Sequence, residues 1–300
     1  MSVRTTVRKA SKKAPSAQRG LLSRYDMYEL CVQSPTALVP FLKAVHGGEP
    51  TRLGEDFCGT AALSRRWIIE TPEGSAVGVD LDPEPLKIAS QQTPKDAGMR
   101  LKLIKGDVLK LKAAKSSAGS GAGGPFDLIF VGNFSIGEIH RREDLVKYFR
   151  TCVSRLAKAK RRSPGGVFVC DIYGGETAFV EGALERTHPG PPTDPALRIK
   201  YTWQQRTANA LTGMVENALH FRTVRAGVVE QEFTDAFVYN WRLWSVPELR
   251  EAMLEAGFST TEVYAKLVDA VDDQGKPYVR PVTDASELEE SFIVCVVGRV

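Results

Sequence analysis

The sequence is poor in the residues that build metal sites and disulfide frameworks. Its 300 residues include five cysteines and four histidines, and no two cysteines form a Cys-X-X-Cys pair. The histidines have no ligand spacing among themselves or with the cysteines, which argues against a zinc site. Four of the cysteines lie in apolar or strand-like segments, so we expect reduced, mostly buried thiols in a cytoplasmic protein.

Long hydrophobic runs are also missing. No apolar stretch reaches the ~18 residues that a helix needs to cross a bilayer, and the N-terminal segment lacks the apolar core of a secretory signal. We therefore expect no membrane partner. Acidic residues are absent from the first nineteen positions, which hold six of the 40 basic side chains and leave 34 against 36 acidic ones elsewhere. The net charge of +4 thus comes from this basic tail.

The composition of the tail allows three roles. We expect residues 1–20 to be a disordered, solubilising segment, with an arm for nucleic acid or an acidic partner and an organelle transit peptide as alternatives. Nucleic-acid binders usually present a basic face, whereas the rest of this chain is weakly acidic. The tail therefore allows a nucleic-acid partner that the remainder of the sequence does not favour.

Strand and helix signals alternate along most of the remaining chain. Residues 34–46 predict a helix, with Ser34 as N-cap and Pro35 at the first helical position, and residues 143–160 predict another. Strands are predicted over residues 52–57, 75–80, 101–105, 126–131, 167–172, 259–266 and 291–298. This alternation predicts one α/β domain over residues 21–300, with a mostly parallel sheet covered on both faces.

Three β-rich runs interrupt the alternation in the second half of the chain. They cover residues 198–206, 214–224 and 228–241, and turn-like breaks separate them. The pattern predicts an antiparallel meander inserted into the α/β domain, and we place the insertion at residues 176–243. Because it follows the fifth strand, at the edge where open α/β sheets bind ligands, we expect it to form a lid.

Small and acidic residues follow three of the predicted strands. Gly59 and Thr60 stand between a strand and a helix, where the backbone can approach a ligand and free N–H groups are available. Asp80 ends the second strand and can accept hydrogen bonds from ribose hydroxyls. Asp107 follows the third and can accept from an exocyclic amine. Each acid alone could simply cap a helix, but their joint occurrence at strand ends predicts a nucleoside site. The glycine spacing is not that of a dinucleotide fingerprint, which disfavours an NAD(P) dehydrogenase.

These motifs resemble those of the class I (Rossmann-like) S-adenosylmethionine-dependent methyltransferases, over about residues 25–300. Residues 55–61 resemble the glycine motif of that family, although Phe57 and Ala61 replace its first and last glycines. Residues 25–29 and 239–244 resemble segments of a bacterial subgroup. The resemblance implies a seven-stranded sheet of order 3-2-1-4-5-7-6 whose last strand is antiparallel.

The same resemblance implies S-adenosylmethionine as the cofactor. The residues that it places around this cofactor are Tyr28, Glu55, Phe57, Cys58, Gly59, Thr60, Asp80, Leu81, Asp107, Val108 and Asn133. The family's acid at the end of the first strand maps onto Glu55, with Asp56 beside it. Either carboxylate could be the one that faces the ligand.

Methyl transfer from a sulfonium is an in-line displacement, which depends on holding the acceptor and the methyl group in line. A base is needed only where the acceptor carries a proton, and the candidates for that role are His140 and Tyr173. The residues that we expect near the acceptor are Tyr25, Trp203, His220, Tyr239 and Arg242.

A small-molecule acceptor is the leading interpretation. A nucleic-acid or protein methyltransferase that uses the basic tail is one alternative. A non-catalytic relative that only binds S-adenosylmethionine is another, because a fold does not guarantee its chemistry.

Overall fold

The computed structural model describes residues 21–95, 97–113, 122–160, 164–266 and 268–300. The predicted tail, residues 1–20, lies outside these ranges. Within them, no helix is both long enough and apolar enough to cross a membrane.

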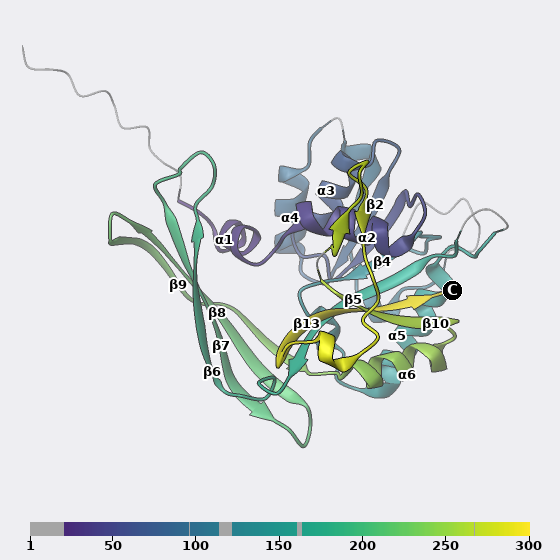
Figure 1. Ribbon diagram of the computed structural model, residues 1–300. Helices are drawn as coiled ribbons and strands as arrows, with labels where there is room; N and C mark the ends of the chain where they lie inside the picture. Colours follow the sequence, from purple (N-terminus) through teal and green to yellow (C-terminus); the bar gives the residue numbers. More distant parts are fainter. Residues whose placement is uncertain (1–20, 96, 114–121, 161–163, 267) are drawn as a thin grey trace, which may run out of the picture.

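Seven strands form a central sheet in the order β10-β13-β5-β4-β1-β2-β3 (Figure 1). They are β1 (Arg52–Asp56), β2 (Ser75–Asp80), β3 (Leu101–Lys105), β4 (Leu128–Val131), β5 (Val167–Gly175), β10 (Thr260–Ala265) and β13 (Ser291–Arg299). Strands β1 to β5 pair in parallel, and β13 runs antiparallel to both β5 and β10. Counted along the chain, this is the order 3-2-1-4-5-7-6, so the predicted topology is confirmed.

Helices cover both faces of the central sheet, which is why its inner strands are apolar on both sides. On β5, Val169 packs with α2 (Pro35–His46) and α3 (Ala62–Glu70) on one face. The next residue back, Phe168, packs with α5 (Arg142–Arg155) and α6 (Val246–Ala256) on the other. Helix α4 (Pro83–Gln92) follows β2.

The ends of two helices show where capping residues predict a helix boundary and where they do not. Helix α2 begins at Pro35 and ends at His46 as the caps predict, with Gly47 in the left-handed region at φ 76°. Helix α5 ends at Arg155, five residues before the predicted end. There the chain leaves the helix to pair with the segment before β4: Phe126 N donates to Arg155 O and Ala157 N donates to Phe126 O, both at 2.8 Å. A long-range pairing therefore ends this helix.

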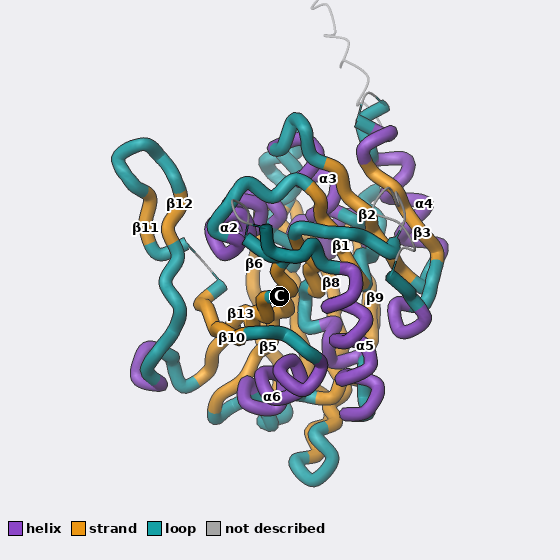
Figure 2. Tube along the Cα trace, turned by 90° about the vertical axis from the view of Figure 1, so that its right-hand side faces the viewer, coloured by secondary structure: helices purple, strands orange, loops and turns teal. Residues whose placement is uncertain are grey.

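The insertion forms a separate antiparallel sheet in the order β6-β7-β8-β9. Its strands are β6 (Gly182–Pro189), β7 (Arg198–Asn209), β8 (Met214–Arg225) and β9 (Val228–Arg242). The last three coincide closely with the three predicted runs. The sequence did not predict β6, because its residues are mostly exposed and lack an apolar alternation. It also did not predict the short hairpin of β11 (Ala270–Val271) and β12 (Pro277–Tyr278), which projects from one side of the molecule (Figure 2).

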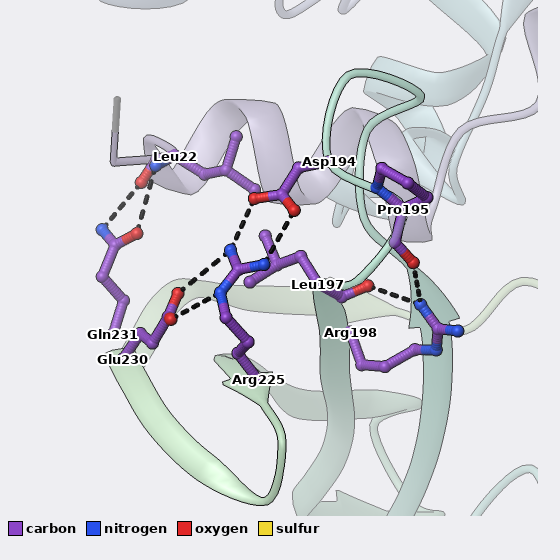
Figure 3. Close-up of polar contacts among 8 residues, drawn as sticks. All are labelled: Leu22, Asp194, Pro195, Leu197, Arg198, Arg225, Glu230 and Gln231. Carbon is purple, nitrogen blue, oxygen red and sulfur yellow. Dashed lines mark hydrogen bonds and ion pairs between the residues drawn. The ribbon is translucent and has the colours of Figure 1, made fainter. Parts of the chain in front are cut away.

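Helix α1 (Arg24–Cys31) packs on the inserted sheet and not on the central one. Met27 is fully buried in a cluster with Phe221 and Ala236 of that sheet. Just before the helix, the Gln231 amide accepts from Leu22 N at 3.1 Å and donates to Leu22 O at 2.9 Å (Figure 3). Helix α1 and the inserted sheet thus form one packed unit facing the central sheet.

Candidate functional site

A cavity of about 920 Å³ lies between the carboxyl ends of the central strands and the inserted sheet. The loops after β1, β2, β3 and β4 form one wall, and α1 and β9 form the other. Ten of the eleven residues that we expect around the cofactor, including Tyr28 of α1, line this cavity; only Glu55 does not.

Asp80 is positioned by backbone groups on two sides. Its Oδ2 accepts from Gly59 N at 2.7 Å and its Oδ1 accepts from Asp82 N at 2.9 Å. Burial raises the pKa of Asp80, and these N–H groups offset part of that rise. Gly59 has φ 52°, and nothing lies within 4 Å of the place a Cβ would take. The carboxylate is therefore fixed beside open space, with lone pairs left for a ligand.

Asp107 caps the short helix η2 (Val108–Lys110). Its Oδ1 accepts from Leu109 N at 2.9 Å, and its Oδ2 lies 3.1 Å from Lys110 Nζ. Burial favours a higher pKa for Asp107, but Lys110 and Leu109 outweigh it and hold the pKa below its usual value. The side chain lines the cavity in an ionised form. Beside it, Leu81 is 68% exposed, an unusual degree for leucine, and offers an apolar surface to a flat ring.

The structure places the two adjacent acids of β1 on opposite faces. Glu55 accepts from Ser64 N at 2.8 Å and lines a smaller cavity of about 40 Å³ that shares Phe57 and Asn133 with the large one. Burial raises the pKa of Glu55 to about 7. Asp56 turns away into the core, where both its oxygens bind Arg155, at 2.6 and 2.9 Å. Only Glu55 borders a cavity here.

The two residues that depart from the glycine motif keep the backbone conformation of glycine. Phe57 has φ 57° and Ala61 has φ 52°, both in the left-handed region that costs a residue with a Cβ on the order of 1–3 kcal/mol. The Phe57 ring lies edge-on to Tyr148, with centroids 6.4 Å apart, and also borders both cavities. The turn shape of the motif is therefore retained without its glycines.

Two buried polar atoms beside the cavity have no hydrogen-bond partner among the described residues. They are Gln33 Oε1, in the loop between α1 and α2, and Thr60 Oγ1, after β1. Both residues line the cavity. Buried polar groups in folded proteins are nearly always paired, so these two indicate a ligand that supplies the missing partners. Sequence reasoning named Thr60 but missed Gln33.

The two candidates for a base lie outside the cavity. The His140 Nε2 is 2.7 Å from Asn240 O, so the ring is held against β9. The Tyr173 hydroxyl donates to Gln205 at 2.9 Å and accepts from the Asn217 amide at 3.3 Å. Both groups are occupied in contacts that join the inserted sheet to the central domain.

Of the five residues expected near the acceptor, Tyr25 and Tyr239 line the cavity. Trp203 does not, and its Nε1 donates to Asn217 at 2.7 Å within the inserted sheet. His220 accepts from Asp235 N at 3.0 Å. Arg242 lies over the Trp244 ring, with its Cζ 3.8 Å from the ring centre. These last three have structural partners instead.

Glu138, which sequence reasoning missed, enters the cavity from the short helix η3 (Ser135–Glu138) after β4. Its Oε1 accepts from Trp241 Nε1 at 2.8 Å. Gly137 permits this approach, because a Cβ there would lie only 2.8 Å from the Trp241 Cβ. Its position in the sequence could have identified it, because an acid in the loop after the fourth strand lies at the ligand-binding edge of the sheet.

No family model matches the chain, and no curated protein matches it. Solved structures do match it at low identity. The sugar N-methyltransferase KedS8 from Streptoalloteichus sp ATCC 53650 is 16% identical, with 97% of this chain and 98% of that chain covered and a TM-score of 0.59. A S-adenosylmethionine-dependent methyltransferase from Clostridium acetobutylicum ATCC 824 is 16% identical, with coverages of 92% and 97% and a TM-score of 0.60.

A third match is CalS10, an amino pentose methyltransferase from Micromonospora echinaspora whose structure contains bound SAM. It is 16% identical to this chain, with 95% of this chain and 100% of that chain covered and a TM-score of 0.60. These matches span nearly the whole length of this chain. The chain has the fold of the class I S-adenosylmethionine-dependent methyltransferases.

Proposed function

We propose that the protein is a S-adenosylmethionine-dependent methyltransferase with a small-molecule acceptor. The observation that carries the proposal is the cavity at the ends of β1 to β4, where Asp80, Gly59 and two unpartnered polar atoms meet. Its supporting context is the fold shared with three proteins named as methyltransferases, two of them for sugar acceptors.

The residues at the large cavity fit the nucleoside part of this cofactor. The Asp80 oxygens each accept one backbone N–H and keep a lone pair for a ribose hydroxyl. Leu81 and Val108 offer apolar surface for the adenine ring, and Asp107 lies beside them for its exocyclic amine. Thr60 would gain the partner that it lacks in the protein alone.

The smaller cavity fits the amino-acid end. Glu55 offers a carboxylate for an ammonium group, and the charge of that group would favour the ionised form of Glu55. Lys266 lines the same cavity and is held by the buried Asp171. Burial lowers the pKa of Lys266, but Asp171 outweighs this and raises it, so a full positive charge is available for a carboxylate.

When bound, S-adenosylmethionine supplies an electrophilic methyl group on a sulfonium sulfur. The chain contributes binding, orientation and exclusion of water. Phe57 and Asn133 border the junction of the two cavities, and Phe237 and Tyr239 of β9 close the opposite wall. An acceptor between these walls has few orientations left, which is the main source of acceleration for a displacement in line.

Thermal unfolding with S-adenosylmethionine, S-adenosylhomocysteine and NAD in parallel tests the cofactor. A ligand at 100 times its dissociation constant adds about 2.7 kcal/mol, which shifts the Tm of a chain this long by several degrees. We expect both sulfur nucleosides to raise the Tm and NAD to leave it unchanged.

Two variants sharpen this measurement. Asp80→Asn should abolish the shift, because one oxygen that could accept from the ribose becomes a donor. Asp272→Asn is the matched control, since Asp272 also accepts from two backbone groups, Gln274 N and Lys276 N, but lies in the β11–β12 turn. An unchanged Tm with both sulfur nucleosides on the unmodified protein would refute the proposed function.

A further inference from the structure

The charged groups around the cavity are mostly acidic. Among the described residues, five carboxylates and one cation line it. The cation, Arg24, already pairs with Glu84 at 2.6 Å. Two of the acids, Asp107 and Asp235, also have basic partners. If Asp80 binds the nucleoside of the cofactor, the part of the cavity left for the acceptor therefore still carries negative charge.

Glu138 is the acid that carries this charge. Within the described ranges it forms no ion pair, and its hydrogen bond from Trp241 Nε1, at 2.8 Å, engages only Oε1. None of the described residues donates to its Oε2, and the residue lines the cavity. Glu138 is exposed at the mouth of the cavity, and partial desolvation by its neighbours raises its pKa, with the Trp241 bond as a smaller, opposing effect. A carboxylate in such surroundings is stabilised by any cation that enters.

Aromatic rings extend from Glu138 along the same wall. Trp241 stacks on Tyr239 with centroids 4.6 Å apart, and Tyr239 stacks on Phe237 at 6.4 Å with an interplanar angle of 4°. Tyr28 of α1 meets Phe237 edge to face at 5.0 Å. Tyr239 and Phe237 border the cavity together with Tyr28. Aromatic rings attract cations, and this wall already holds one: the Arg24 guanidinium lies over the Phe237 ring, with its Cζ 5.2 Å from the ring centre.

We propose that the acceptor is an amine, bound as its ammonium between the Glu138 carboxylate and the aromatic wall of Tyr28, Phe237 and Tyr239. The proposal rests on the proposed function and names its substrate class. A carboxylate that forms no ion pair, beside aromatic rings, suits a cation with apolar substituents, whereas a carboxylate or phenolate would be repelled by Glu138.

The same carboxylate can complete the chemistry. An ammonium nitrogen first gives one proton to Glu138, which frees its lone pair. The nitrogen then bonds to the methyl carbon as the carbon–sulfur bond breaks, and that electron pair stays on sulfur as a neutral thioether. The product is an N-methylammonium beside a protonated Glu138. One positive charge remains, on nitrogen, and the proton on Glu138 returns to solvent on product release.

Three probes of one shape test the amine assignment: benzylamine, benzyl alcohol and benzoate. Each is added to the protein saturated with S-adenosylhomocysteine, and binding is measured by calorimetry. We expect benzylamine to bind at least tenfold more tightly than the other two. Glu138→Gln should remove that preference and keep the response to S-adenosylhomocysteine.

Control variants distinguish the effects of the Glu138 charge and of the aromatic ring from general damage to the structure. Glu185→Gln changes an acid of the inserted sheet that pairs with Lys200 and Arg222, away from the cavity, and should bind benzylamine normally. Tyr239→Phe should retain most of the affinity, and Tyr239→Leu should lose several-fold, because only leucine removes the ring. Equal binding of the three probes, no binding of benzylamine, or an unaltered preference in Glu138→Gln would each overturn the assignment. A missing response to S-adenosylhomocysteine would instead count against the proposed function.

Discussion

Residue type alone does not decide which of the two neighbouring acids of β1, Glu55 or Asp56, borders the ligand-binding edge. Successive side chains of a strand point to opposite faces, so of Glu55 and Asp56 only one can border the ligand edge. The sequence could not select between them. The choice depends on Arg155, which lies 99 positions away and binds both oxygens of Asp56 in the core. That contact belongs to the packing of α5 and has no local signal.

The position of Glu55 has a cost that depends on pH. Its pKa is raised from 4.5 to about 7, so the folded state holds a proton that the unfolded state has released. Stability therefore falls as the pH rises from about 4.5 to 7, and the loss is complete above the folded pKa. With about 1.4 kcal/mol for each pKa unit, the loss at pH 8 is on the order of 3 kcal/mol.

We predict that Glu55→Gln stabilises the protein without ligand at pH 8 and changes it little at pH 4.5. Urea unfolding at both pH values measures this difference. Glu84→Gln is the control with the opposite sign, since hydrogen bonds from Tyr25 and Arg24 lower the pKa of Glu84, and it should gain no stability as the pH rises. If Glu55→Gln were equally stable at both pH values relative to the unmodified protein, the buried carboxylate would not be the cause.

At the scale of elements, α1 and the inserted sheet behave as one unit. Met27 shares a cluster with Ile199 and Phe221, and the capping box of Ser23 and Asp26 starts the helix at that surface. The unit reaches the central domain through ion pairs such as Arg65 with Glu29, at 2.6 Å. Weakening the packing between α1 and the inserted sheet should therefore destabilise this wall of the cavity before it destabilises the central sheet.

We predict that Met27→Ala lowers the protection of backbone amides in α1 and β7 to β9 and leaves β1 to β5 unaltered. A fully buried methionine replaced by alanine costs about 2–5 kcal/mol, here within one unit. Hydrogen exchange read by mass spectrometry resolves the two regions. Met253→Ala is the matched control, because Met253 is also fully buried but packs α6 on the central sheet. Uniform loss of protection in Met27→Ala would show that the two units open together.

The pattern of strands and helices in the sequence predicted most of the fold but fewer of the residues of the site. The strand ends that hold Asp80 and Asp107 were predictable, because alternation and strand length are local properties. The lining residues of the inserted sheet were not. Which side of β8 and β9 meets the cavity depends on their register, and this shifts between Leu219 and Phe221. For that reason His220 of β8 was named together with Tyr239 of β9, although only Tyr239 lines the cavity.

Over the whole molecule, the described residues of the cavity begin after the basic tail. Within the described ranges its lining begins at Arg24, and Leu22 is already held by Gln231. We predict that deleting residues 1–20 leaves the Tm shift with S-adenosylmethionine unchanged. Thermal unfolding of both lengths, with DNA and RNA retention at low and high salt, measures this. Loss of the shift would place part of the tail in the site, and salt-sensitive retention by the full chain alone would assign nucleic-acid affinity to the tail.

The position of β9 at the edge of its sheet has an evolutionary consequence. Residues 235–239, which close the cavity opposite the nucleoside, belong to β9, an outer strand of its sheet with a neighbour on one side only. Substitutions there disturb fewer partners than substitutions in an inner strand, and none of them touches Asp80 or Glu55. Under the proposed function, lineages that share this fold can thus change their acceptor by substitutions along one strand, while the residues proposed to bind the methyl donor stay unchanged.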